Sequence, residues 1–180
     1  MALTVLLGGA RSGKSRLAVR LASSTDRPVT FIATAEARDA EMVDRIARHR
    51  AERPPTWSTR EEPWDLGGAL EGVPAGETAV VDCLTLWVSN LIERGVPDSE
   101  VMDRARAAAR VARTRGGAVI AVSNEVGSGI VPMTALGRRF QDLLGEVNAA
   151  WVDAADRAGL MVAGRVLWLP APIAGEGDGS

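Results

Sequence analysis

Residues 8 to 15 read Gly8-Gly-Ala-Arg-Ser-Gly-Lys-Ser15, which satisfies the pattern G-x-x-x-x-G-K-[ST] of a phosphate-binding loop. An apolar run, residues 3–7, precedes this loop, and residues 15–24 follow with apolar side chains at helical spacing. A phosphate loop needs this context, because its curled backbone N–H groups and the N-terminal end of the next helix bind the phosphates together. A glycine-rich turn that fits this pattern by accident would not need a strand before it and a helix after it. The stretch therefore predicts a P-loop nucleotide-binding protein.

Each position of the loop has an expected role. Lys14 is predicted to bridge the β- and γ-phosphates, and the Ser15 hydroxyl to bind Mg²⁺. Lys14 is the only lysine among 21 basic residues, and a compact ammonium reaches between phosphates better than a planar guanidinium does. The residues predicted to bind the phosphates are Gly8, Gly9, Ala10, Arg11, Ser12, Gly13, Lys14 and Ser15.

Apolar strands and helical patterns alternate along the chain. Strands are expected at residues 3–7, 28–33, 78–82 and 117–123, and a closing hairpin at 160–163 and 166–169. Helices are expected at residues 15–24, 39–53, 84–93, 98–115 and 134–157, and residues 56–77 are expected to be irregular. This order predicts an α/β fold of the P-loop NTPase, RecA-like kind, whose mostly parallel sheet is flanked by helices and ends in an antiparallel hairpin. We expect one nucleotide-binding domain over residues 1–169 and a flexible tail over 170–180.

The composition narrows the class of protein. Of the 180 residues 46% are hydrophobic and 24% charged, as in ordinary soluble domains. The net charge of −2 gives no electrostatic reason to bind nucleic acid or an anionic membrane. No apolar run is long enough to predict a membrane span, and no signal peptide is apparent, so a cytoplasmic location is expected. The single cysteine, Cys83, excludes an internal disulfide and a cysteine zinc site.

Acidic residues and one loop are further candidates for the site. Asp82 ends a predicted strand, where a Walker B acid would hold Mg²⁺, although such a residue could instead cap the next helix. The P-loop favours the metal role. Glu61 and Glu62 are, from the residues alone, best interpreted as solvated loop acids. Residues 124–132 leave the end of a parallel strand, where α/β folds place ligand-binding loops, but a plain connector is equally compatible.

His49 is the only histidine of the chain. It falls in the last turn of a predicted helix, among four arginines. A histidine there ordinarily interacts with the negative end of its helix, and the residues alone favour that role over catalysis. The arginines would favour the neutral, nucleophilic imidazole and could bind an attacked phosphate. Because the helix end and the arginines act in opposite directions, both roles remain open on these grounds.

Several motifs together resemble one family. They are the phosphate loop, Ile32-Ala-Thr34, Arg45-Ile-x-x-His49-Arg-x-x-Arg53-Pro54, Ser123-Asn-Glu-Val-Gly-x-Gly-Ile-Val-Pro132, and the stretch from Gly137-Arg-x-Phe140 to Asn148. The chain resembles the bifunctional adenosylcobinamide kinase / adenosylcobinamide-phosphate guanylyltransferases of cobalamin synthesis, in order from residue 3 to about residue 168. The phosphate loop alone indicates a superfamily, whereas the His-Arg and Asn-Glu-Val-Gly segments are much more specific.

The resemblance implies two reactions. ATP or GTP would phosphorylate the aminopropanol hydroxyl of adenosylcobinamide, and GTP would then transfer GMP to that phosphate, with release of pyrophosphate. His49 would carry the GMP covalently, Lys14 would act on the phosphates, and Ser15 and Asp82 would hold Mg²⁺. The resemblance also implies a homotrimer, with the helix of His49 near a neighbouring subunit. It places in nucleotide-contacting segments Thr34, Ala35, Glu36, Glu52, Arg53, Glu61 and Asp82.

Two other functions are compatible with the P-loop. A kinase of another small molecule would use Lys14 but not His49. A nucleotide-dependent regulatory module would hydrolyse nucleotide very slowly; the N-K-x-D guanine-reading motif of Ras-like switches is absent, since Lys14 is the only lysine.

Overall fold

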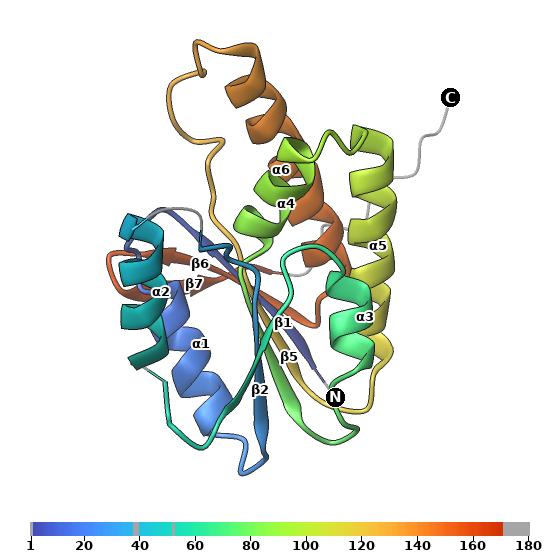
Figure 1. Cartoon of the computed structure of the whole chain (residues 1–180). Helices are drawn as coiled ribbons and strands as arrows, with labels where there is room; N and C mark the ends of the chain where they lie inside the picture. Colours follow the sequence, from blue (N-terminus) through green and yellow to red (C-terminus); the bar gives the residue numbers. More distant parts are fainter. Residues whose placement is uncertain (1, 38–39, 52, 171–180) are drawn as a thin grey trace.

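The computed structural model describes residues 2–37, 40–51 and 53–170, and its centre is one seven-stranded sheet (Figure 1). The strand order is β3-β2-β4-β5-β1-β6-β7. Neighbouring strands are parallel except β6 and β7, which form an antiparallel pair. The strands are β1 Leu3–Gly8, β2 Val29–Ala33, β3 Ser58–Glu61, β4 Thr78–Asp82, β5 Val119–Val122, β6 Arg157–Val162 and β7 Arg165–Trp168.

Helices cover both faces of the sheet, so its central strands are buried on both sides. The helices are α1 Lys14–Ser23, α2 Ala40–Ala51, α3 Leu66–Glu71, α4 Leu84–Glu93, α5 Asp98–Thr114 and α6 Ala135–Ala154. Figure 1 shows α3 to α6 on one side of the sheet and α1 and α2 on the other. The larger core lies under α3 to α6 and contains the fully buried Trp87 and Trp151; the smaller core lies under α1.

The predicted fold class is confirmed, including the mostly parallel sheet and the closing hairpin. The end of the last helix and the pairing of the strand after it differ from the prediction. The last helix ends at Ala154 and not at residue 157, because Arg157 already begins β6. Strand β6 pairs in parallel with β1 as well as antiparallel with β7. A hairpin inferred from local apolar runs gives no sign of this second, long-range pairing.

The expectation of an irregular segment at residues 56–77 is wrong, because this segment contains β3 and α3. Strand β3 is the polar, fully exposed edge strand Ser-Thr-Arg-Glu, so it shows no apolar alternation. Helix α3 has six residues including two glycines, and the Asp65 side chain caps it by accepting a hydrogen bond from the Gly68 N–H. Both elements are stabilised by their neighbours more than by local propensity.

The parallel strands bring four chain segments to the same edge of the sheet. The phosphate loop follows β1, Thr34 follows β2, Asp82 ends β4, and Asn124 lies just beyond β5. The carboxyl ends of parallel strands are where α/β folds bind ligands. Within the described ranges, no helix has both the length and the apolar character needed to cross a membrane.

Candidate active site

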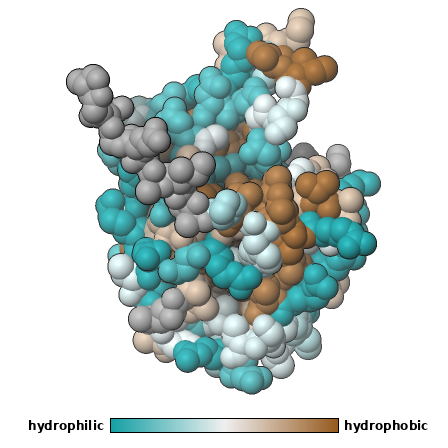
Figure 2. Space-filling model, turned by 180° about the vertical axis from the view of Figure 1, so that it is seen from behind, coloured by the Kyte–Doolittle hydropathy of each residue, from teal (hydrophilic) through white to brown (hydrophobic). Residues whose placement is uncertain are grey.

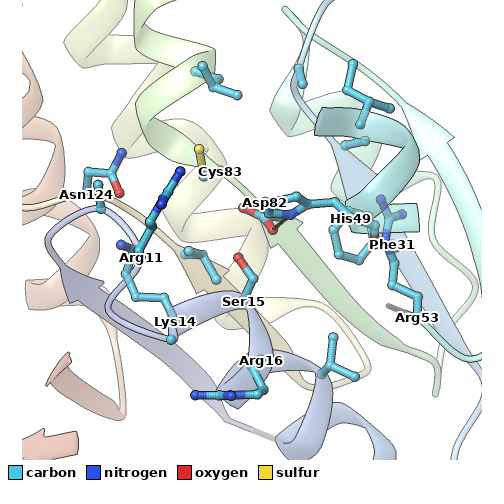
Figure 3. A pocket seen from close by; sticks show the side chains of 18 of the residues that line it. Arg11, Lys14, Ser15, Arg16, Phe31, His49, Arg53, Asp82, Cys83 and Asn124 are labelled. Atoms are coloured by element: carbon cyan, nitrogen blue, oxygen red, sulfur yellow. Dashed lines mark hydrogen bonds and ion pairs between the residues drawn. The ribbon is translucent and has the colours of Figure 1, made fainter. Parts of the chain in front are cut away.

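A cavity of about 820 Å³ opens at this edge of the sheet (Figure 3). The phosphate loop and the start of α1 form one wall, α2 forms the opposite wall, and the ends of β2, β3, β4 and β5 form the floor. The residues predicted from sequence that line it are Ala10, Arg11, Ser12, Gly13, Lys14, Ser15, Ala35, His49, Arg53, Glu61 and Asp82. Ligand cavities of this size hold a molecule as large as a nucleotide.

The phosphate loop is shaped by two glycines and by a strand behind it. Gly8 has a φ of 149°, and a Cβ built on it would lie 2.5 Å from the carbonyl oxygen of Met161 in β6. Gly13 has a φ of 96° in the left-handed region, immediately before α1. Side chains at these two positions would be strained, so the backbone can curl as phosphate binding requires.

Two neighbouring segments hold this loop in place. The N–H of Gly164, in the β6–β7 turn, donates to the carbonyl oxygen of Ser12 at 3.0 Å. The N–H of Glu125, just after β5, donates to the carbonyl oxygen of Gly8 at 3.0 Å. The loop is therefore preorganised by contacts from both sides of β1.

Lys14 is buried within the loop. Its Nζ donates to the carbonyl oxygens of Gly8 at 2.8 Å and Gly9 at 2.7 Å. Burial lowers the pKa of Lys14, while the nearby Cys83 and Asp82 act to raise it. The loop carbonyls stabilise the buried ammonium of Lys14, which also lines the cavity. An ammonium in this position is suited to neutralise phosphate charge.

Ser15 and Asp82 place side-chain oxygen atoms at the lining of the cavity. Figure 3 shows the Ser15 side chain pointing toward Asp82. Among the described residues, no group of three or more His, Cys, Asp and Glu side chains is arranged to hold a metal ion. Mg²⁺ suits such a sparse oxygen site, because it is bound by one or two protein oxygens together with phosphates and water. The alternative role of Asp82 was to cap the next helix. Helix α4 begins after Cys83, and no side-chain hydrogen bond caps it, so Asp82 makes no such bond.

His49 lies in the last turn of α2, as predicted, and its side chain faces the cavity. The imidazole Nδ1 is 3.9 Å from Oδ2 of Asp82, and the side chains are 40% and 14% exposed. The structure thus brings the only histidine of the chain to the same cavity as Lys14. The residues alone favour a structural role for His49, because its distance to Asp82 depends on where the fold places α2 relative to the end of β4.

Arg53 connects the end of α2 to the cavity wall. Its Nε donates to the carbonyl oxygen of His49 at 2.9 Å, and its guanidinium lies 3.6 Å above the centre of the Phe31 ring. Burial lowers the pKa of Arg53 and Asp82 opposes this, but a guanidinium remains protonated at neutral pH. Arg53 therefore places a fixed positive charge beside His49 and Asp82.

Other predicted residues lie around the cavity without lining it. Thr34 is fully buried, and its hydroxyl donates to the Cys83 carbonyl at 2.7 Å and accepts from the Cys83 N–H at 2.8 Å. This hydroxyl ties the end of β2 to that of β4. Gly8, Gly9 and Glu36 also do not line the cavity within the described ranges. Glu52 lies outside the described residues.

The two candidate acids at residues 61 and 62 have different positions. Glu61 is exposed, as expected, but it ends β3 and lines the cavity, so only its assignment to a loop is wrong. The Glu62 carboxylate instead accepts from the N–H groups of Trp64 and Asp65 and shapes the turn before α3.

Several cavity residues were not predicted from the sequence. They include Arg16 and Arg20 of α1, which bring positive charge to the wall, and Phe31, which brings an aromatic ring. Asn124, the first residue of the candidate segment 124–132, also lines the cavity. Nothing local distinguishes Arg16 or Arg20 from the many other arginines of this chain. Phe31 lies within an apolar strand and is interpreted as core. The remaining lining residues are Val19, Ala33, Ala37, Met42, Ile46, Cys83, Leu86 and Val122.

Known proteins resemble this chain over nearly its whole length. Residues 4–169 match the family described as cobinamide kinase / cobinamide phosphate guanyltransferase. The bifunctional adenosylcobalamin biosynthesis protein CobP of Pseudomonas aeruginosa is 45% identical over 174 residues, covering 96% of this chain and 97% of that protein. The bifunctional adenosylcobalamin biosynthesis proteins CobU of Escherichia coli and Salmonella typhimurium are 34% and 35% identical, covering 90% of this chain and 96% of each relative.

Two solved structures share the fold at low sequence identity. The RadB recombinase has a TM-score of 0.50 at 17% identity, covering 88% of this chain and 73% of its own. An ATPase of a type III secretion system has a TM-score of 0.52 at 13% identity, covering 88% and 51%. These similarities support the RecA-like architecture. The chain belongs to the cobinamide kinase / cobinamide phosphate guanyltransferase family, and it is a kinase and guanylyltransferase that acts on cobinamide and nucleotide substrates.

Proposed function

We propose that a single cavity serves both reactions and that His49 carries the GMP group between them. The observation that supports this most directly is that the only histidine of the chain and the P-loop lysine, Lys14, line the same cavity. A kinase of another small molecule would have no use for a histidine in that position.

In the kinase step, the phosphate loop holds the triphosphate of ATP or GTP. The aminopropanol hydroxyl of adenosylcobinamide attacks the γ-phosphorus, the bond from that phosphorus to the β-phosphate oxygen breaks, and the hydroxyl proton leaves to solvent. Lys14 stabilises the negative charge that develops on the phosphate oxygens. The products are adenosylcobinamide phosphate and a nucleoside diphosphate.

In the guanylyl step, His49 divides one displacement into two. An imidazole nitrogen attacks the α-phosphorus of GTP, a P–N bond forms, and pyrophosphate leaves with the electrons of the broken P–O bond. A phosphate oxygen of adenosylcobinamide phosphate then attacks the same phosphorus, and the P–N bond breaks. This gives adenosylcobinamide-GDP and returns the neutral imidazole.

The geometry around His49 favours one ring nitrogen as the nucleophile. Nδ1 is the nitrogen near the Asp82 carboxylate, so we infer that Nε2 attacks phosphorus. Arg53 is hydrogen-bonded to the backbone of His49 and supplies positive charge for the α-phosphate. The arginine and the carboxylate thus orient the nucleophile and its target.

Ser15 and Asp82 would hold Mg²⁺, which would neutralise phosphate charge in both reactions. The hydroxyl of Ser15 and the carboxylate of Asp82 are the oxygen ligands that this ion prefers. We further propose a homotrimer in which α2 lies near a neighbouring subunit. We also propose that the enzyme acts in the cytoplasm, where GTP and ATP are available.

Labelling with GTP that carries radioactive phosphorus at the α-position tests the covalent step. We expect label on the protein that is stable to base and labile to acid, as a phosphoramidate is. His49→Asn should form no label and no adenosylcobinamide-GDP, while its kinase rate stays within a few-fold of the original. Lys14→Ala should lose both reactions. Retention of the label by His49→Asn would disprove His49 as the nucleophile.

A further inference from the structure

The segment from residue 127 to residue 136, named here the apolar arm, carries an unusual group of exposed side chains. Ile130 and Met133 are each 96% exposed, Val131 is 68% exposed, and Leu136 is 59% exposed. Figure 1 shows the segment standing clear of the sheet beside α4 and α6, and Figure 2 shows apolar side chains at the tip of this projection. Single exposed apolar residues are common, but four in ten residues indicate a binding surface.

Hydrogen bonds at the start of α6 fix the shape of the arm. Arg138 donates through Nη1 to the carbonyl oxygens of Pro132 and Met133, both at 3.0 Å. The Thr134 side chain accepts from the N–H of Gly137 at 3.0 Å and caps α6. A Cβ on Gly137 would lie 2.8 Å from the Pro132 ring, so this close packing requires glycine. The apolar side chains are therefore displayed by an anchored backbone.

The base of the arm is part of the cavity. Asn124 lines the cavity, and the N–H of Glu125 is bonded to the phosphate loop at Gly8. The Glu125 carboxylate accepts from the N–H of Gly127 at 2.7 Å, where the arm begins. These two hydrogen bonds fix the base of the arm beside the phosphate loop.

We propose that the apolar arm binds the corrin ring of the cobinamide substrate while the aminopropanol end of that substrate enters the cavity. This inference rests on the proposed function and adds the site of its second substrate. The corrin of cobinamide is a broad macrocycle that carries methyl groups between its amide side chains. These methyl groups and the ring face offer apolar area of the kind that four exposed aliphatic side chains can cover. The nucleotide needs the side of the cavity formed by the phosphate loop. The bulk of the corrinoid would therefore lie outside the cavity, on an adjoining surface.

The proposed homotrimer places a neighbouring subunit near α2, and the arm by itself is too small to form a subunit interface. Stable protein interfaces bury about 1,200–2,000 Å² in total, more than four side chains at the tip of a projection provide. A small rigid ligand that is anchored at its other end by the cavity needs much less area. A substrate would also gain from the attachment of the arm to the phosphate loop. Binding of the corrin ring at the arm could position the distant reacting group of the substrate near the nucleotide.

The double variant Ile130→Ser/Met133→Ser tests the proposal, because it should weaken the binding of the corrinoid and leave the binding of the nucleotide unchanged. Both residues are exposed, so the variant should fold. We expect the KM for adenosylcobinamide in the kinase reaction to rise at least about tenfold, since burying such side chains is strongly favourable. The KM for the nucleotide should stay unchanged. The rate of labelling by GTP carrying α-phosphate label should also stay unchanged, because that half-reaction involves no corrinoid.

Leu167→Ser is the matched control, because Leu167 is a large apolar residue of β7 that is 63% exposed and lies outside the arm. It should leave the KM for adenosylcobinamide unchanged. An unchanged corrinoid KM in the double variant would overturn the proposal, as would a lower molecular mass of that variant in sedimentation equilibrium, which would make the arm a subunit contact. If GTP fails to label the original enzyme, the proposed role of His49 fails, but the kinase KM still decides the role of the arm.

Discussion

His49 and Asp82 face each other in the cavity, with Nδ1 of the imidazole 3.9 Å from Oδ2 of the carboxylate. This distance is too long for a hydrogen bond, so the carboxylate attracts and orients the ring without being fully engaged by it. The oxygen lone pairs of Asp82 remain suited to a metal ligand. Asp82 is therefore placed to act both on His49, the proposed nucleophile, and on a cation at the phosphate loop.

The variant Asp82→Asn keeps the shape of the side chain and removes its charge. We expect both reactions to slow by about tenfold or more, and the Mg²⁺ concentration that gives half-maximal rate to rise, because an amide is a weaker ligand than a carboxylate. Mg²⁺ titrations of each reaction measure this effect. Asp103→Asn, at a highly exposed carboxylate on α5, is the control and should change neither quantity. An unaltered Mg²⁺ requirement in Asp82→Asn would remove Asp82 from the metal site.

Replacing Arg53 by lysine tests whether the guanidinium positions the end of α2. Lysine keeps the charge but loses the stack on Phe31 and the Nε bond to His49. We expect a loss of about 1–2 kcal/mol in the free energy of unfolding and a slower labelling by GTP. Arg94→Lys is a matched control, because Arg94 also lies 3.6 Å above a ring, that of Trp64, and does not line the cavity. It should lower stability by a similar amount without slowing the labelling.

Two glycine-to-alanine substitutions should have opposite effects on stability. Gly8→Ala places a methyl group against the carbonyl of Met161 in a backbone conformation that alanine rarely adopts. We expect it to lower the free energy of unfolding by about 2 kcal/mol or more and to weaken nucleotide binding. Gly145→Ala, at an exposed position of α6 where an added Cβ would have no atom within 4 Å, should raise the free energy of unfolding by about 0.5–1 kcal/mol. Chemical denaturation of both variants checks these signs, and a stable Gly8→Ala would contradict the packing described here.

Cys83 should be an unreactive thiol at neutral pH. Burial, and secondarily the charge of Asp82, raises the pKa of Cys83 to about 12. Only the thiolate reacts with iodoacetamide, so alkylation at pH 8 should be slower than that of an exposed cysteine by about two orders of magnitude or more. The rate should increase about tenfold per pH unit as long as the protein stays folded. Fast alkylation at pH 8 would show that the pKa of this thiol is not raised.

The sequence by itself was sufficient to predict the features that depend on residues close together along the chain. The phosphate loop, its entering strand and its leaving helix are all contained in the first 24 residues, so their pattern could be read directly. The apolar runs of β1, β2, β4 and β5 identified a parallel sheet for the same reason, since strands buried on both faces are continuously apolar. The local chemistry of His49 favoured a structural role but left catalysis open, and only the resemblance to a family favoured the catalytic role.

The tertiary structure decided which distant residues meet. The sheet places the end of β4 beside the phosphate loop and under α2, and only this packing brings His49 to Asp82 and buries Thr34 between strands. It also turned a polar tetrapeptide into the edge strand β3, which carries Glu61 to the cavity. The physical reason is that hydrogen bonds within a helix or loop join neighbours in the chain, whereas sheet pairing and helix packing join residues whose separation no local pattern records.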